Sequence, residues 1–175
     1  FEKLFDSFKN GEIDIMVGTQ MLAKGLDFDN VSLVGIMNAD SMLSFPDFRA
    51  HERAFQLMLQ VAGRAGRKTK QGKVLIQTYN PCHNTIQQVT RNDYQGMFKE
   101  QMYERLNFKY PPFYRLIKVQ LKHVSFEKVE QASQWLAQHL RSNVGDVLVL
   151  GPQAPSINRI RNQYIQVILI KLPIN

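Results

Sequence analysis

The spacing of apolar residues divides the first part of the chain into helical and extended segments. Residues 1–8 place large apolar side chains at the i, i+3, i+4, i+7 spacing of a helix, which Asn10–Gly11 would end. A further helix is expected at about residues 50–65. Three short, mostly apolar runs lack polar alternation, as parallel strands covered on both faces do; they are Ile13–Val17, Val31–Met37 and Lys73–Tyr79. This order predicts an α/β sheet domain.

The second part of the chain has a different pattern, with a β-α-β-β order that predicts a small α+β domain. Tyr110–Phe113 contains two prolines, which favour a rigid extended turn. Arg115–Lys122 alternates and predicts a strand, and a helix is expected from its N-cap Ser125 to Arg141. The buried side of this helix is expected to carry Val129, Ala132, Leu136 and Leu140. Two further strands are expected at Val147–Leu150 and Ile165–Leu172.

We therefore predict an α/β domain with a parallel sheet over residues 1–90, a polar linker over 91–112 and an α+β domain over 113–175. With 175 residues, 44% of them hydrophobic, the chain has enough apolar material for such cores, and disorder is excluded. No apolar run is long enough to span a membrane. Because the first residue is Phe rather than Met, we expect a piece of a longer protein.

The cysteine content is too low for a disulfide framework or a metal site. The single cysteine, Cys82, is followed by His83, and no further cysteine could complete a zinc site. A reduced lone cysteine is typical of the cytoplasm, which is the predicted location.

Positive charge is concentrated in the second half of the chain. The net charge is +7; residues 1–90 hold 10 basic and 9 acidic residues, whereas residues 91–175 hold 12 and 6. This asymmetry is consistent with attraction to a polyanion, and equally with a surface kept soluble by lysines.

A helical segment at residues 52–67 carries the strongest chemical signal. Gln60, Arg64 and Arg67 follow i, i+4, i+7 spacing and would present an amide and two guanidiniums to one target. Two guanidiniums suit phosphate oxygens, which accept bidentate hydrogen bonds. Gly63 and Gly66 are unfavourable inside a helix, so the helix ends there or its backbone approaches a ligand. The alternative is a solvated face whose arginines complement the helix dipole.

This segment resembles motif VI of superfamily 2 helicases, which has the pattern QxxGRxGR. The resemblance implies that Arg64 and Arg67 are arginine fingers acting on nucleotide bound to a partner lobe. It also implies that Gln60 helps to couple the nucleotide to nucleic acid.

A second segment, residues 18–27, resembles motif V of the same helicases. The resemblance assigns Thr19, Gln20 and Lys24 to the nucleic-acid backbone, and Gly25 and Asp27 to the nucleotide. Taken alone, the segment is equally consistent with an ordinary turn after a strand.

The longer runs ADSMLSFPDFRAHERAFQLMLQVAGRAGR, GTQMLAKG and ERLNFKYPPF resemble the PriA family of primosomal replication-restart helicases. The resemblance implies the later part of a RecA-like helicase lobe 2, followed by the α+β C-terminal domain of that family. It further implies an ATP-dependent 3′-to-5′ DNA helicase that restarts replication at stalled forks. The implied partners are forked and single-stranded DNA, single-stranded-DNA-binding protein and other primosome components.

Several parts that such an enzyme needs are missing from these 175 residues. There is no GxxxxGK[ST] phosphate loop and no Asp-Glu pair placed to hold Mg²⁺. ATP and Mg²⁺ would be bound mainly by the absent lobe 1, and the zinc of the family lies in a cysteine-rich region outside this chain. We therefore expect no metal in this chain, and no ATP hydrolysis by the chain alone.

Basic residues near aromatic rings in the second half suggest contacts with a single strand. The candidates are Lys109, Arg115, Lys118, Arg159 and Arg161. In the alternative interpretation the rings of Tyr110 and Phe113 pack in the core and the lysines are solvated. Trp135 lies off the apolar stripe of its helix, where it would face another domain or be half-buried.

Two other functions remain compatible with the sequence. The chain could be a non-catalytic module that binds DNA or partner proteins, or lobe 2 of another superfamily 2 DNA translocase. The PDFRA and YPPF neighbourhoods favour the PriA family over the latter.

Overall fold

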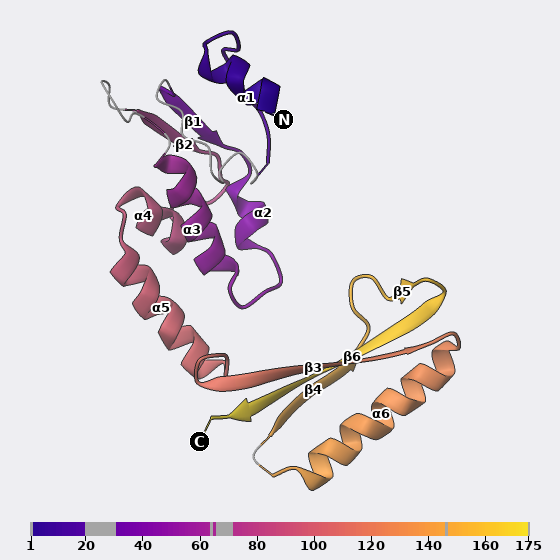
Figure 1. The fold of residues 1–175 in the computed structure, drawn as a ribbon. Helices are drawn as coiled ribbons and strands as arrows, with labels where there is room; N and C mark the ends of the chain where they lie inside the picture. The colour runs from indigo at the N-terminus through magenta and orange to yellow at the C-terminus, as the bar shows by residue number, and fades with distance from the viewer. Residues whose placement is uncertain (1, 20–30, 64, 66–71, 146, 175) are drawn as a thin grey trace. The chain divides into compact units, whose positions relative to one another are not determined.

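The computed structural model describes residues 2–19, 31–63, 65, 72–145 and 147–174 (Figure 1). The chain divides into two compact units, residues 1–101 and 102–175, and the boundary falls inside helix α5 (Tyr94–Asn107). Each unit has its own sheet, parallel in the first and antiparallel in the second.

The first unit contains a parallel strand pair and several helices. Its strands are β1 (Leu33–Ile36) and β2 (Lys73–Ile76), paired from Leu33–Lys73 to Ile36–Ile76. Its helices are α1 (Glu2–Lys9), α2 (Ala39–Leu43), α3 (Ala50–Ala62), α4 (Asn84–Thr90) and the start of α5. The parallel pair, with helices between and after the strands, agrees with the predicted α/β class.

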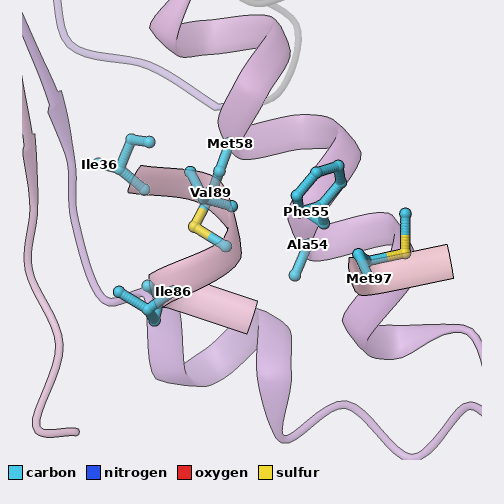
Figure 2. Packing of buried hydrophobic residues seen from close by; sticks show 8 residues of the cluster. Ile36, Ala54, Phe55, Met58, Ile86, Val89 and Met97 are labelled. Atoms are coloured by element: carbon cyan, nitrogen blue, oxygen red, sulfur yellow. The ribbon is translucent and has the colours of Figure 1, made fainter. Parts of the chain in front are cut away.

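Helix α3 provides the centre of the first hydrophobic core. Phe55 and Met58 are at most 1% exposed, and they pack with Ile36 of β1, Val89 of α4 and Met97 of α5 (Figure 2). Burial of these large side chains fixes which side of α3 faces inward, because each buried apolar side chain contributes roughly 1.5–3 kcal/mol. The opposite side of α3 is therefore held toward solvent.

The predicted strand at Ile13–Val17 is wrong, since this segment has no regular secondary structure. Ile15 and Val17 are 80% and 91% exposed. An apolar run supplies a surface to bury, but a strand also needs a neighbour that satisfies its backbone hydrogen bonds. The strands predicted at Val31–Met37 and Lys73–Tyr79 are present but shorter. The first ends before Asn38, whose left-handed backbone caps α2.

Helices α4 and α5 were not predicted, and α5 occupies most of the segment interpreted as a polar linker. Local side-chain acceptors begin both helices. His83 Nδ1 accepts from the Thr85 N–H at 3.2 Å, and Asp93 Oδ1 accepts from the Gly96 N–H at 2.8 Å. Few residues of α5 are buried, Met97 and Gln101 among them, so its apolar pattern is weak. Local caps mark the start of both helices.

The second unit is an antiparallel sheet with one long helix on it (Figure 1). Its strands are β3 (Tyr114–His123), β4 (Leu148–Gln153), β5 (Arg159–Ile160) and β6 (Gln163–Pro173). The sheet order is β3-β6-β4, with β5 pairing β6 in a hairpin. Helix α6 (Phe126–Asn143) buries Ala137 against Val149 and Ile168. This arrangement agrees with the predicted α+β class, although β5 was not predicted.

Helix α6 agrees with its prediction in extent but not fully in its buried face. The Ser125 hydroxyl caps it by accepting from the Lys128 N–H at 3.4 Å. Val129 is buried, but Ala132 is exposed and Ser133 is buried in its place. Ser133 can be buried because its hydroxyl keeps a hydrogen bond, which it donates to the Glu130 carbonyl at 2.8 Å. Leu136 and Leu140 pack partly buried on the core, as expected.

Candidate nucleotide and nucleic-acid site

Helix α3 positions the motif VI segment. Its buried side carries Ala54, Phe55 and Met58, whereas Arg53 and Gln60 are exposed on the other side. Over its described residues the helix is therefore amphipathic, with Gln60 on its polar side. Gln60 projects from a helix whose rotation is fixed by the core.

A network of hydrogen bonds fixes the start of α3. Asp47 accepts from the Arg49 N–H at 2.8 Å and from Arg53 Nη1 at 2.9 Å, while the Asp47 carbonyl accepts from the Ala50 N–H. Arg49 pairs with Glu52 at 3.2 Å. The hydrogen bond and charge of Glu52 hold the pKa of Arg49 above its ordinary value. Asp47 therefore ties the loop before α3 to the first turns of the helix.

Helix α3 ends at Ala62, with Gly63 as its C-cap. The Gly63 N–H donates to the Leu59 carbonyl at 2.9 Å. A Cβ at Gly63 would lie 3.4 Å from the Leu59 carbonyl oxygen, an ordinary contact, and its φ of −65° is open to any residue. Arg64 and Arg67 lie outside the described residues, and their role as arginine fingers stays a prediction.

The motif V segment is described only at its start. Thr19 is exposed and lies in no helix or strand. Gln20, Lys24, Gly25 and Asp27 lie outside the described residues, so their assignments to nucleic acid and nucleotide also stay predictions.

A polar cluster at the carboxyl ends of β1 and β2 was not predicted. Asp40 accepts from the Thr78 hydroxyl at 2.9 Å and from the Tyr79 N–H at 3.1 Å. Partial desolvation opposes ionisation of Asp40, but these hydrogen bonds outweigh it and hold its pKa below the ordinary value. Tyr79 contributes only its backbone N–H to these contacts with Asp40, and the residue is 97% exposed. No sequence motif indicated these contacts, because they join residues 38 and 39 positions apart.

The five cations predicted to bind nucleic acid in the second half are all exposed but do not form one surface. Arg115 and Lys118 are three positions apart on β3, so their side chains leave opposite faces of the sheet. Lys109 Nζ lies 5.9 Å from the centre of the Tyr114 ring. Arg159 and Arg161 are the pair that the structure brings together, on the β5–β6 hairpin.

The Tyr110 ring packs against a buried lysine, Lys171. Lys171 is 4% exposed; its Nζ donates to the Phe108 carbonyl at 2.7 Å and lies 3.5 Å from the centre of the Tyr110 ring. Burial, with the nearby charge of Lys109, lowers the pKa of Lys171. Tyr110 is partly buried and packs on this buried lysine. Trp135, by contrast, is 66% exposed and stacks on His139.

No metal site or membrane span is found in the part of the chain that the structure describes. Its His, Cys, Asp and Glu side chains form no group of three or more that could hold a metal ion. Its helices are too short or too polar to cross a bilayer.

Comparison with known proteins identifies both units. Residues 2–69 match the model of the helicase conserved C-terminal domain, which confirms the predicted helicase lobe 2. Residues 107–174 match the primosomal protein N C-terminal domain.

Curated relatives match across almost the whole chain. The replication restart protein PriA of Bacillus subtilis is 46% identical over 164 residues, 93% of this chain and 20% of that protein. The protein of the same name from Synechocystis is 42% identical over 171 residues, 97% of this chain and 21% of that protein. The chain thus spans about a fifth of the length of these relatives. The chain carries the helicase conserved C-terminal domain and the primosomal protein N C-terminal domain. It belongs to the PriA family of replication restart proteins.

Proposed function

We propose that this chain is part of an ATP-dependent 3′-to-5′ DNA helicase that restarts replication at stalled forks. In this proposal it supplies the arginine fingers and contacts to the DNA backbone. The observation that carries the proposal is α3, a helix anchored in the core by Phe55 and Met58 that leads through Gly63 directly into Arg64. Guanidiniums that contact a nucleotide can stabilise charge that develops on a transferred phosphoryl group.

The chain's own donors fit the phosphates of ATP but not Mg²⁺. Guanidinium and amide groups, here Arg64, Arg67 and Gln60, donate hydrogen bonds to phosphate oxygens. Mg²⁺ instead takes carboxylate and phosphate oxygens, which another lobe must supply. In this proposal Gly25 and Asp27 face the nucleotide, and Thr19, Gln20 and Lys24 hold the DNA backbone. The zinc of the full-length protein does not fit this chain, since its sequence has one cysteine.

The proposed partners are forked and single-stranded DNA, single-stranded-DNA-binding protein and primosome components, in the cytoplasm. The naming of the relatives as replication restart proteins supports a role at DNA forks. The excess of basic residues in the second half of the chain supports a polyanionic partner.

Arginine substitutions in the full-length protein that contains this chain test the proposal. Arg64→Ala and Arg67→Ala should each reduce DNA-stimulated ATP turnover by about 10³-fold or more, with DNA affinity nearly unchanged. Arg91→Ala is the matched control, because Arg91 is exposed and, among the described residues, its side chain donates only to Gln87. Normal turnover in both finger variants would contradict the proposal.

The isolated 175-residue chain provides a second test. It should hydrolyse no ATP above background, with or without DNA, because the phosphate loop is absent from its sequence. Should the chain bind DNA while the finger variants of the full-length protein remain fully active, the non-catalytic binding module would be the better description.

A further inference from the structure

The C-terminal end of α5 is closed by the two backbone hydrogen bonds of a Schellman motif. The Tyr110 N–H donates to the Arg105 carbonyl at 2.8 Å, and the Lys109 N–H donates to the Leu106 carbonyl at 3.3 Å. Lys109 has φ 58°, the left-handed backbone with which such a motif leaves the helix. These bonds satisfy two of the carbonyls that a helix leaves free at its end, and the Phe108 carbonyl requires a donor from elsewhere.

The side chain of Lys171, 63 positions further along the chain, supplies this donor. Its Nζ donates to the Phe108 carbonyl at 2.7 Å and lies 3.5 Å from the centre of the Tyr110 ring. A positive charge at the C-terminal end of a helix also complements the helix dipole. Lys171 on β6 therefore caps α5 from a different element of the second unit.

The position of Lys171 in the sheet would suit an apolar residue. Strand β6 lies between β3 and β4, and its register places Lys171 between Leu116 and Leu148. Lys171 is 4% exposed, and among the described residues no carboxylate pairs with it. Burial, more than the nearby charge of Lys109, lowers the pKa of Lys171, so its charged form is disfavoured. A methionine would avoid this cost, so packing alone does not explain the lysine.

The helix that Lys171 caps is the element shared by the two units. Helix α5 begins at Tyr94, in the first unit, and ends at Asn107, in the second. In the first unit it contributes Met97 to the hydrophobic core. Coupling between distant parts of a protein is carried by rigid elements and by the hydrogen bonds that hold them. The cap at the end of α5 is thus placed where it affects how firmly the second unit holds this helix.

We propose that Lys171 is a positioning residue that couples the C-terminal unit to the helicase lobe by holding the last turn of α5 on β6. In this role Lys171 contacts neither nucleotide nor DNA. It keeps the end of α5 ordered, so that movement of the first unit during ATP turnover is transmitted to the sheet of the second. The proposal rests on the proposed function and adds to it a residue that links ATP turnover to strand separation.

Hydrogen exchange of the full-length protein tests the cap. Lys171→Met removes the donor and the charge but keeps the length of the side chain, so the N–H groups of the last turn of α5 should exchange about tenfold faster. The N–H groups of α6 should exchange at an unchanged rate, because a methionine buried at this position does not destabilise the sheet. Lys171→Arg keeps the charge and a donor, and should restore most of the protection.

Unwinding of a labelled forked duplex, measured together with ATP turnover in the same reaction, tests the coupling. Lys171→Met should lower the number of base pairs opened per ATP hydrolysed by about three- to tenfold, while DNA-stimulated turnover stays within about twofold of that of the unsubstituted protein. Lys122→Met is the matched control and should change neither value, because Lys122 is a strand lysine that is exposed.

Unchanged exchange at the end of α5 in Lys171→Met would overturn the cap and with it the proposal. Equally faster exchange in α6 would show that the lysine stabilises the whole unit, and an unchanged number of base pairs per ATP would show that the contact does not couple the units; either result also overturns the proposal. These results leave the helicase proposal intact if Arg64→Ala still abolishes ATP turnover. If the unsubstituted protein has no DNA-stimulated turnover, the helicase proposal and the coupling fail together, whereas the exchange rates still decide the cap.

Discussion

The arginines of the two units are held in different ways. In the first unit, Arg49 and Arg53 are tied to Glu52 and Asp47, and these pairs stabilise the start of α3. In the second unit, Arg159 stacks on Tyr164 and keeps its charge unneutralised. An arginine neutralised by a nearby carboxylate contributes to the scaffold, whereas one oriented by a ring or an amide remains available to an external anion.

The largest expected effect comes from the core that orients α3. Phe55→Ala should destabilise the first unit by about 3–5 kcal/mol, because it removes a side chain that is 1% exposed. Urea unfolding of the chain should show this as an earlier loss of helical circular dichroism. Fluorescence of Trp135, the single tryptophan, reports on the second unit and should shift much less. An equal shift of both signals would contradict separate cores.

Loss of the Asp47 network should have a smaller effect. Asp47→Ala removes the acceptor of the Arg49 N–H and the partner of Arg53, at a cost of about 1–2 kcal/mol. Arg53→Ala should cost only about 0.2–1 kcal/mol, because its side chain is 53% exposed. Denaturant midpoints of the two variants provide the comparison. If Arg53→Ala costs as much as Asp47→Ala, the ion pair rather than the hydrogen bond from the Arg49 N–H is the main contribution.

The cap of α6 provides the corresponding test in the second unit. Ser125→Ala should cost about 1 kcal/mol, since the N–H of Lys128 loses its acceptor. The fluorescence midpoint of Trp135 should fall, while Ser125→Asp should preserve it. A midpoint that does not move in Ser125→Ala would indicate that the sheet contacts alone fix the start of α6.

The smallest expected effect concerns the pH dependence of the first unit. The folded pKa of Asp40 is lowered, so its ionised form is favoured by folding. Its stabilisation is present above its unfolded pKa of about 3.8 and is lost as the pH falls through the folded value. Asp40→Asn should therefore flatten the acid limb of the stability curve below about pH 4, measured by thermal unfolding. An unchanged acid limb would rule out a contribution from this carboxylate.

The elements predicted correctly are those with strong periodicity or a recognisable cap. The large apolar residues of α3, the alternation of β3 and the Ser125 cap of α6 each determine their structure locally. Ile13–Val17 shows the limit of this reasoning, because its apolar composition does not supply a pairing strand. Helices α4 and α5 begin at His83 and Asp93, whose capping role is visible only in the structure.

The candidate site was predictable where a motif lies in one continuous segment. Gln60 is exposed on α3 as its spacing predicted. The Asp40 cluster and the packing of Lys171 on Phe108 join residues about 40 and 63 positions apart, so no local pattern reveals them. The alternation of β3 could have separated Arg115 from Lys118, because positions three apart in a strand lie on opposite faces.

The most direct test of the central claim measures affinity for a transition-state analogue. In the full-length protein with DNA bound, Arg64→Gln should weaken binding of ADP–aluminium fluoride by about 10³-fold. Affinity for ADP alone should change little, because the guanidinium acts on charge that develops at the transferred phosphoryl group. Equal affinities of the unsubstituted protein and Arg64→Gln for the analogue would contradict the assignment of this residue as an arginine finger.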